Sequence, residues 1–184
     1  MKTKFILHGG FAGRTNSENN LFFKEILKDT SEQVDILLVY FAKEQTEYER
    51  MVNEDTLQFK RNGKDKKLNF EIATVENFLK QLKKADIVYF HGGQTLKLLE
   101  ILKGYPDLAE SLKGKIVAGE SAGACILSNC FYTKTEGRVF EGLGFVPVKT
   151  ICHYIGENKE KLDKCPKELE TLLLKDYQFK VFFR

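Results

Sequence analysis

Short apolar segments alternate with amphipathic segments along the first two thirds of the chain. The apolar segments are rich in β-branched and aromatic residues, and the predicted strands are Lys4–His8, Asp35–Phe41, Asn69–Thr74, Asp86–His91 and Lys115–Ala118. The segments between them carry apolar residues at helical spacing, and the predicted helices are Ser17–Lys28, Gln45–Arg61, Glu76–Lys84 and Thr95–Leu102. This alternation predicts βαβ units, and hence an α/β protein whose mostly parallel sheet is covered by helices on both faces.

The pattern changes after Ser121. Phe131–Thr133 and Arg138–Phe140 are short and bounded by Gly137 and Gly142, which predicts a hairpin or an irregular excursion. Three further elements are predicted: a return to the sheet over Val148–His153, a helix over Lys159–Leu174 and a last strand over Tyr177–Phe183.

Length and composition agree with one soluble domain spanning residues 1–184. The chain is 42% hydrophobic and 30% charged, its predicted linkers are short, and it has no internal repeat. The formal net charge is only +3, so we expect neither nucleic acid nor a membrane surface as a partner. Because the chain has no apolar run as long as a signal peptide or a membrane span, we expect a cytoplasmic protein.

The four cysteines, Cys125, Cys130, Cys152 and Cys165, form no C-x-x-C pair. This spacing disfavours a zinc site, and we predict no metal. Reduced, buried thiols are expected rather than a disulfide framework.

Two glycine turns follow predicted strands, where ligands collect in open α/β sheets. The turn after His8 lacks G-x-G-x-x-G and is expected to be structural. In the other turn, the backbone N–H groups of Gly92 and Gly93 are candidates to face an oxyanion or a carboxylate, although an ordinary strand-to-helix turn explains the pattern equally well.

The segment VAGESAGAC at Val117–Cys125 predicts a nucleophile elbow. A strand leads into G-x-S-x-G and a helix follows, so Ser121 is expected to project above the sheet. The N–H of Ala122 is then placed to donate into an oxyanion hole. Cys125 lies one helical turn further on, and we expect it to be a buried structural thiol.

A serine hydroxyl needs a base, and the chain has three histidines. His153 is the best candidate, because only His153 follows Ser121 with room for an acid between them, as in elbow hydrolases. The acids in that interval are Glu136, in a polar loop, and Glu141, which is as easily explained as a solvated turn residue.

Three segments together resemble the dipeptidase E (aspartyl dipeptidase) and cyanophycinase family of serine peptidases, within the class I glutamine amidotransferase-like superfamily. They are Gly119–Ala124, Phe90–Leu99 and Pro147–Tyr154. The resemblance implies a three-layer, flavodoxin-like sandwich without a cofactor. It implies a Ser121 nucleophile and a His153 base, with Glu136 at the place of the acid, where most family members carry aspartate. The oxyanion hole would use Ala122 and one of Gly92 and Gly93.

These features predict a serine exopeptidase that hydrolyses short peptides through an acyl-enzyme. Gln94 and Glu120 are candidate substrate contacts, although a glutamate at position 120 is equally explained as salt-bridged or solvated. The resemblance does not extend to the family's aspartyl preference, because the segment Ile155–Lys167 after His153 is short and has lysines but no arginine. A non-catalytic binding protein of the same fold and a small esterase are the alternatives.

The resemblance also concerns the end of the chain. Relatives are expected to continue past the last helix with further strands, whereas this chain ends after Tyr177–Phe183. A second copy of the chain is a candidate to cover the remaining sheet edge, which would give a homodimer.

Overall fold

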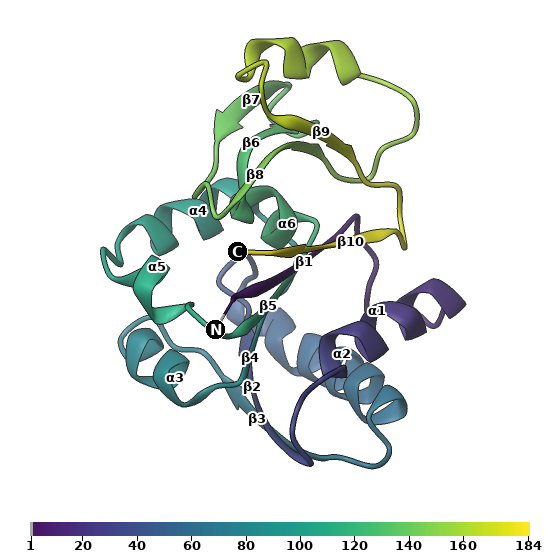
Figure 1. Cartoon of the computed structure of the whole chain (residues 1–184), viewed down its shortest axis with the longest axis vertical. Helices are drawn as coiled ribbons and strands as arrows, with labels where there is room; N and C mark the ends of the chain where they lie inside the picture. The colour runs from purple at the N-terminus through teal and green to yellow at the C-terminus, as the bar shows by residue number, and fades with distance from the viewer. Residues whose placement is uncertain (1) are drawn as a thin grey trace.

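The computed structural model describes residues 2–184. Its main sheet has six strands in the order β10-β1-β5-β4-β2-β3, and it is parallel except for β10, which runs antiparallel to β1 (Figure 1). The strands are β1 (Lys4–His8), β2 (Gln33–Val39), β3 (Lys67–Ile72), β4 (Ile87–Phe90), β5 (Ile116–Glu120) and β10 (Phe179–Phe183). The parallel strands place their carboxyl ends at one edge, where ligands bind in sheets of this kind.

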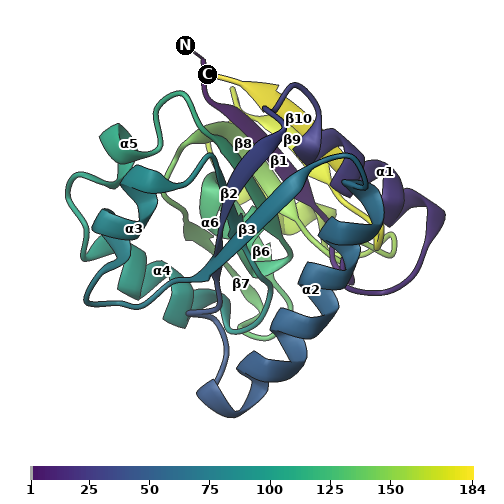
Figure 2. The same ribbon diagram turned by 90° about the horizontal axis from the view of Figure 1, so that it is seen from below.

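Helices cover both faces of this sheet, as Figure 2 shows from below. The first face carries α1 (Ser17–Leu27) and α2 (Tyr48–Asn62), the latter preceded by the 3-10 turn η1 (Gln45–Glu47). The other face carries α3 (Phe78–Lys84), α4 (Thr95–Lys103), α5 (Leu108–Ser111) and α6 (Ala122–Leu127). Each face has its own apolar core, because successive residues of the buried strands point to opposite faces of the sheet.

A second sheet of four strands, in the order β7-β6-β8-β9, lies beyond α6 (Figure 1). Its strands are β6 (Ser128–Thr133), β7 (Arg138–Glu141), β8 (Val146–Ile151) and β9 (Glu170–Leu173), and the 3-10 helix η2 (Lys159–Lys164) precedes β9. Buried residues of this sheet, among them Phe131 and Val148, belong to the same apolar core as α4 and α6. The second sheet is therefore packed onto the first through α6.

The α/β class, the five early strands and the early helices are confirmed, with shifts of a few residues at their ends. The predicted hairpin is also confirmed, because β6 and β7 pair antiparallel, and the last strand is β10. Val148–His153 does not return to the main sheet, since β8 pairs with β6 and β9 in the second sheet.

The predicted helix over Lys159–Leu174 is wrong. Only Lys159–Lys164 is helical, as a 3-10 helix, and Glu170–Leu173 forms a strand beside β8. Pro166 explains the break, because proline lacks an N–H donor and disfavours helical backbone in the residue before it. That preceding residue, Cys165, is also tied to β6 by a disulfide to Cys130.

The disulfide between Cys130 and Cys165 corrects the expectation that all four cysteines are reduced. The expectation is confirmed for Cys125 and Cys152, which are free and buried. Within residues 2–184, no helix combines the length and the apolar character that crossing a membrane requires.

Candidate active site

Ser121 occupies a sharp turn between β5 and α6. Its backbone has φ 47° and ψ −105°, a strained conformation for a residue with a side chain. The turn needs its flanking glycines: a Cβ on Gly119 would lie 2.5 Å from the carbonyl carbon of Gly123, and a Cβ on Gly123 would lie 2.3 Å from the carbonyl oxygen of Phe90. This geometry is that of a nucleophile elbow.

The Ser121 side chain contacts His153, and His153 contacts Asp176. Ser121 Oγ lies 2.9 Å from His153 Nε2, and His153 Nδ1 lies 2.6 Å from Asp176 Oδ1. When the Nδ1 proton is donated to the Asp176 carboxylate, Nε2 is left as an acceptor for the serine hydroxyl. The three side chains thus have the arrangement that a nucleophile, a base and an orienting acid require.

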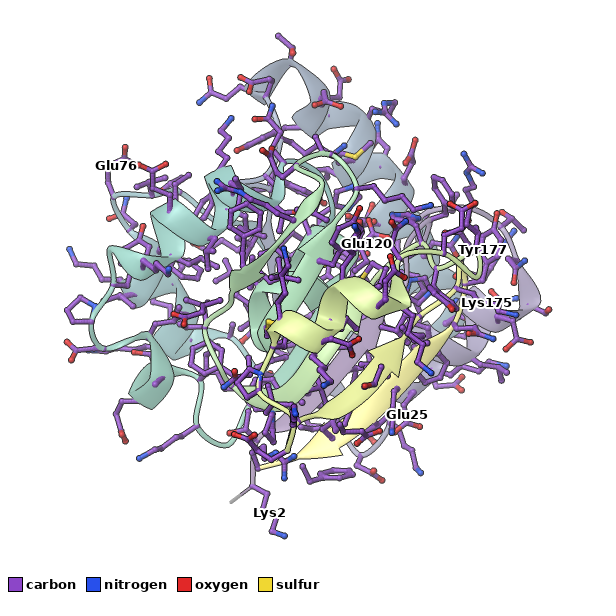
Figure 3. The ribbon with its side chains drawn as sticks, turned by 90° about the horizontal axis from the view of Figure 1, so that it is seen from above. Lys2, Glu25, Glu76, Glu120, Lys175 and Tyr177 are labelled. Atoms are coloured by element: carbon purple, nitrogen blue, oxygen red, sulfur yellow. A yellow bond between two sulfur atoms is a disulfide. The ribbon has the colours of Figure 1, made fainter. Side chains whose placement is uncertain are left out.

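Asp176, rather than Glu136, holds the imidazole. Glu136 lies exposed in the turn between β6 and β7 and makes no hydrogen bond or ion pair to His153 in the described chain. Asp176 reaches the site because β10 pairs with β1, and just before β10 the Tyr177 N–H donates to the Gly10 carbonyl at 3.2 Å. Figure 3 shows Tyr177 on the same side of the molecule as Glu120, the residue before the serine.

The glycine turn after β1 fixes the position of the imidazole ring. Gly10 has φ +139°, and a Cβ there would lie 2.0 Å from His153 Cε1. The Phe11 ring packs edge-on against the imidazole at a centroid distance of 5.1 Å, and the His153 N–H donates to the Gly9 carbonyl at 3.1 Å. The turn that the sequence marks only as structural is therefore a wall of the site.

The other two histidines are buried and held by protein groups. His8 Nδ1 accepts the Gly10 N–H at 3.1 Å, so Nε2 carries the proton that binds Asn19 Oδ1 at 3.0 Å. Burial lowers the pKa of His8, against the opposing charge of Glu120. His91 is enclosed in a buried ion network, which leaves His153 as the histidine that faces the serine.

The two N–H groups free to bind an oxyanion belong to Gly93 and Ala122. Neither donates a hydrogen bond within residues 2–184, whereas the Gly92 N–H is turned toward Glu120 Oε1 at 3.3 Å. Gly93 has φ +148°, and a Cβ there would lie 2.4 Å from the Ala42 carbonyl oxygen. Of the predicted oxyanion donors, the geometry accordingly favours Gly93 and Ala122 over Gly92.

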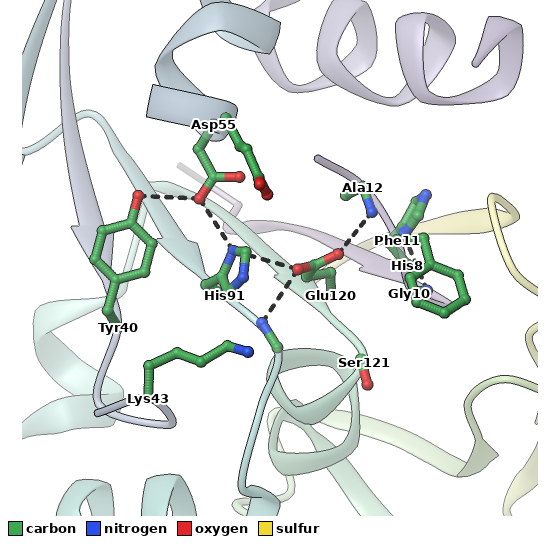
Figure 4. Close-up of polar contacts among 12 residues, drawn as sticks. His8, Gly10, Phe11, Ala12, Tyr40, Lys43, Asp55, His91, Glu120 and Ser121 are labelled. Carbon is green, nitrogen blue, oxygen red and sulfur yellow. Dashed lines mark hydrogen bonds and ion pairs between the residues drawn. The ribbon is translucent and has the colours of Figure 1, made fainter. Parts of the chain in front are cut away.

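Glu120 is at the centre of a buried network beneath the site (Figure 4). Its Oε2 accepts the Ala12 N–H at 2.8 Å, and its Oε1 lies 3.3 Å from His91 Nδ1. The same His91 nitrogen lies 3.0 Å from Asp55 Oδ2, which also accepts the Tyr40 hydroxyl at 3.0 Å. Glu120 is thus salt-bridged and buried, the alternative that the sequence left open.

Burial and charge oppose each other in this network. Burial favours the neutral form of Glu120, but the charge of His91 and the Ala12 N–H outweigh it and lower the pKa of Glu120. Burial alone would lower the pKa of His91, but the charges of Asp55 and Glu120 prevail and raise it. Burial raises the pKa of Asp55. The network therefore favours a Glu120 carboxylate facing an imidazolium at His91.

A cavity of about 510 Å³ opens beside Ser121 and His153, and charged side chains from three segments line it. Arg14 comes from the loop after β1, Lys43 from the loop after β2, and Arg50 from α2. Their charge is partly offset by Glu54 of α2, which pairs with Arg50 at 3.1 Å. These cations could not be predicted from the sequence, because they are scattered over segments that carry no motif.

Gln94 does not share this cavity. It lies at the start of α4, in a separate hollow together with Glu136. Ser121 and His153 do not line that hollow. The structure thus does not bring Gln94 to the serine.

Two free thiols lie behind the serine and the histidine. Cys125 Sγ lies 3.6 Å from Cys152 Sγ, and the Cys152 thiol donates to the Ser121 carbonyl at 3.4 Å. The hydrogen bond from Cys125, together with burial, raises the pKa of Cys152 well above its ordinary value. A thiol with a raised pKa is a poor nucleophile, so Cys152 is structural. Cys125 is buried, as the sequence predicts.

Comparison with known proteins places this chain among peptidases. The sequence model of peptidase family S51 matches residues 5–174. A provisionally named peptidase E from Listeria monocytogenes EGD-e is 21% identical with a TM-score of 0.68, and the match covers 100% of this chain and 98% of that one. A peptidase from an acI-B1 Actinobacterium is 21% identical with a TM-score of 0.69, over 99% of this chain and 84% of that one. A search of curated proteins found no match.

The two structural likenesses establish the fold, and the family match spans most of the chain. The resemblance to dipeptidase E that the sequence motifs indicate is confirmed. The chain belongs to peptidase family S51 and is a serine peptidase.

Proposed function

We propose that the protein hydrolyses short peptides with Ser121 as nucleophile, His153 as general base and Asp176 as the acid that orients His153. The observation that carries this proposal is the continuous chain of contacts from Ser121 Oγ to His153 Nε2 at 2.9 Å and from His153 Nδ1 to Asp176 Oδ1 at 2.6 Å. Both distances suit proton transfer.

The geometry supports an acyl-enzyme mechanism. Ser121 Oγ attacks the scissile carbonyl while His153 Nε2 takes the hydroxyl proton, and Asp176 stabilises the imidazolium that forms. The N–H groups of Gly93 and Ala122 bind the developing oxyanion. His153 then gives its proton to the leaving amine, and a water molecule activated by the same imidazole resolves the ester.

The cavity beside the serine suits a substrate residue that bears a carboxylate. Arg14 forms no ion pair in the described chain, and its guanidinium lies 3.8 Å from the centre of the Phe11 ring. This stacking directs a planar donor toward the cavity, which favours bidentate binding of a carboxylate. The arginine that the segment after His153 lacks is thus supplied from another segment, and we include acidic residues among the proposed substrates.

A non-catalytic binding protein is the competing function. That alternative rests on the short C-terminus and on the glutamate at position 136, and the contact of His153 with Asp176 removes the second reason. The Gly93 and Ala122 N–H groups, which donate no hydrogen bond within residues 2–184, also favour catalysis, because a site that only binds has no need of an oxyanion hole.

A dipeptide library tests the proposal. The wild-type protein and Ser121→Ala are incubated with the same dipeptides, and released amino acids are measured. We expect turnover by the wild type, strongest for acidic N-terminal residues, and a fall of roughly 10⁴-fold or more in the variant. Equal turnover by the two proteins would show that another group performs the hydrolysis.

A further inference from the structure

A second cavity lies beside the Ser121 and His153 pair. It has a volume of about 320 Å³ and shares Ser121, His153 and Gly93 with the larger cavity. The rest of its wall comes from Thr95 of α4, from residues 132–135 at the end of β6 and in the turn that follows, and from the buried Cys125 and Cys152. The reacting atoms of a bound peptide would therefore adjoin both cavities.

Only the larger of the two cavities offers carboxylates, although Arg14, Lys43 and Arg50 line it as well. The larger cavity carries carboxylates, Glu54 and the buried Glu120, as well as cations. The smaller one is lined by Lys134 and by no carboxylate. Lys134 forms no ion pair in the chain from residue 2 to residue 184, so its ammonium group is free for a ligand.

This charge difference gives a dipeptide one preferred orientation. A free dipeptide carries an ammonium group at one end and a carboxylate at the other. The ammonium group suits the carboxylates of the larger cavity, and the carboxylate suits Lys134 with the threonine hydroxyls beside it. In that orientation the leaving residue occupies the smaller cavity, and its amine lies next to His153, which must protonate it.

We propose that Lys134 binds the α-carboxylate of the leaving residue, so that the smaller cavity selects dipeptides over longer or amidated peptides. This inference rests on the proposed peptidase function. A third residue or a C-terminal amide replaces the α-carboxylate of the leaving residue by a neutral amide. The charge-assisted hydrogen bond to Lys134 is then lost. The turn between β6 and β7 thereby sets the length of the substrate.

The test compares one dipeptide, with the N-terminal residue that the enzyme prefers, as the free acid and as the C-terminal amide. We expect the wild type to favour the acid by about tenfold in kcat/KM, the scale of one charge-assisted hydrogen bond to an exposed lysine. In Lys134→Met the rate on the acid falls, mainly through KM, and the ratio of acid to amide approaches one. Lys64→Met is the matched control: it removes the same charge near the start of β3, at the opposite end of the sheet, and should keep the wild-type ratio.

The outcomes separate this inference from the proposed function. A wild-type ratio near one, or a ratio unchanged in Lys134→Met, would overturn the role of Lys134 while the peptidase function stands. Absence of Ser121-dependent cleavage of both substrates would overturn the peptidase function and this inference with it.

Discussion

Replacing Asp176 by asparagine tests which acid serves His153. The substitution keeps the shape of the side chain, removes its charge and presents an amide at a nitrogen that lies 2.6 Å away. The imidazole is then no longer held in the tautomer that leaves Nε2 free to accept the serine proton, and the imidazolium loses its counter-charge.

The size of the effect follows from the exposure of the pair. The His153 and Asp176 side chains are 37% and 35% exposed, so solvent screens their interaction. Two unit charges about 4 Å apart at an effective dielectric constant of about 20 attract by about 4 kcal/mol. That energy corresponds to about 10³-fold in rate, and screening at this exposure lowers it. We therefore expect kcat/KM to fall by about 10²–10³-fold.

The assay is the initial rate of hydrolysis of the dipeptide that the wild-type enzyme cleaves best, with circular dichroism as the check of folding. Glu136→Gln is the matched control, because it makes the same charge change on an exposed turn, and we expect its rate to stay within about twofold. Asp176→Glu should retain more activity than Asp176→Asn, since it keeps the charge. A large loss in Glu136→Gln with little loss in Asp176→Asn would refute this reasoning.

Three further predictions concern the wall of the site, the disulfide and the buried network. Gly10→Ala should lower activity by about 10²-fold, the scale expected when a catalytic group is misplaced by about 1 Å, because its methyl group would meet the His153 ring at 2.0 Å; wild-type turnover in a folded variant would contradict this. The Cys130 to Cys165 disulfide links residues 35 positions apart, and its reduction should lower the free energy of unfolding by about 3–4 kcal/mol, measured as a fall in Tm. Cys130→Ser should show the same fall in Tm, and adding reductant to that variant should lower its Tm no further. Because the pKa of His91 is raised in the folded protein, the stability that the His91 charge contributes is complete below about pH 6.5 and is lost as pH rises through the folded pKa. Urea unfolding between pH 6 and 9 should show this loss in the wild type, and the free energy of unfolding should depend less on pH in His91→Asn. The same pH dependence in both proteins would contradict this prediction.

The elements that the sequence predicted well are those whose signal is local. β1, β4 and β5 are apolar segments buried on both faces, and the elbow needs only the strand, the glycines and the helix that surround Ser121. Gly119 and Gly123 are required by backbone contacts within a few residues of the serine or with the neighbouring strand. Such constraints involve residues that are close in sequence or have a strong local signal, so the segment alone predicts them.

The misassigned features depend on contacts between distant segments. Only one of the four residues of β9 is fully buried, and the segment becomes a strand through its pairing with β8. No periodicity within Lys159–Leu174 shows that pairing. Asp176 follows the histidine by 23 positions and reaches it only because β10 returns beside β1. Glu136 was predicted because the acid was expected to lie between the nucleophile and the base in the sequence, whereas Asp176 lies after His153. The one signal that could have suggested Asp176 is its place directly before the predicted last strand, at the edge where the site lies.

The central claim, that Ser121 is an activated nucleophile, is tested most directly by labelling with a fluorophosphonate and locating the adduct by peptide mass spectrometry. Such a reagent reacts with a serine whose hydroxyl is activated by a neighbouring base. We predict a single adduct, on Ser121, that is absent from Ser121→Ala and forms slowly in Asp176→Asn. An adduct on another residue, or none on the folded wild-type protein, would contradict the account.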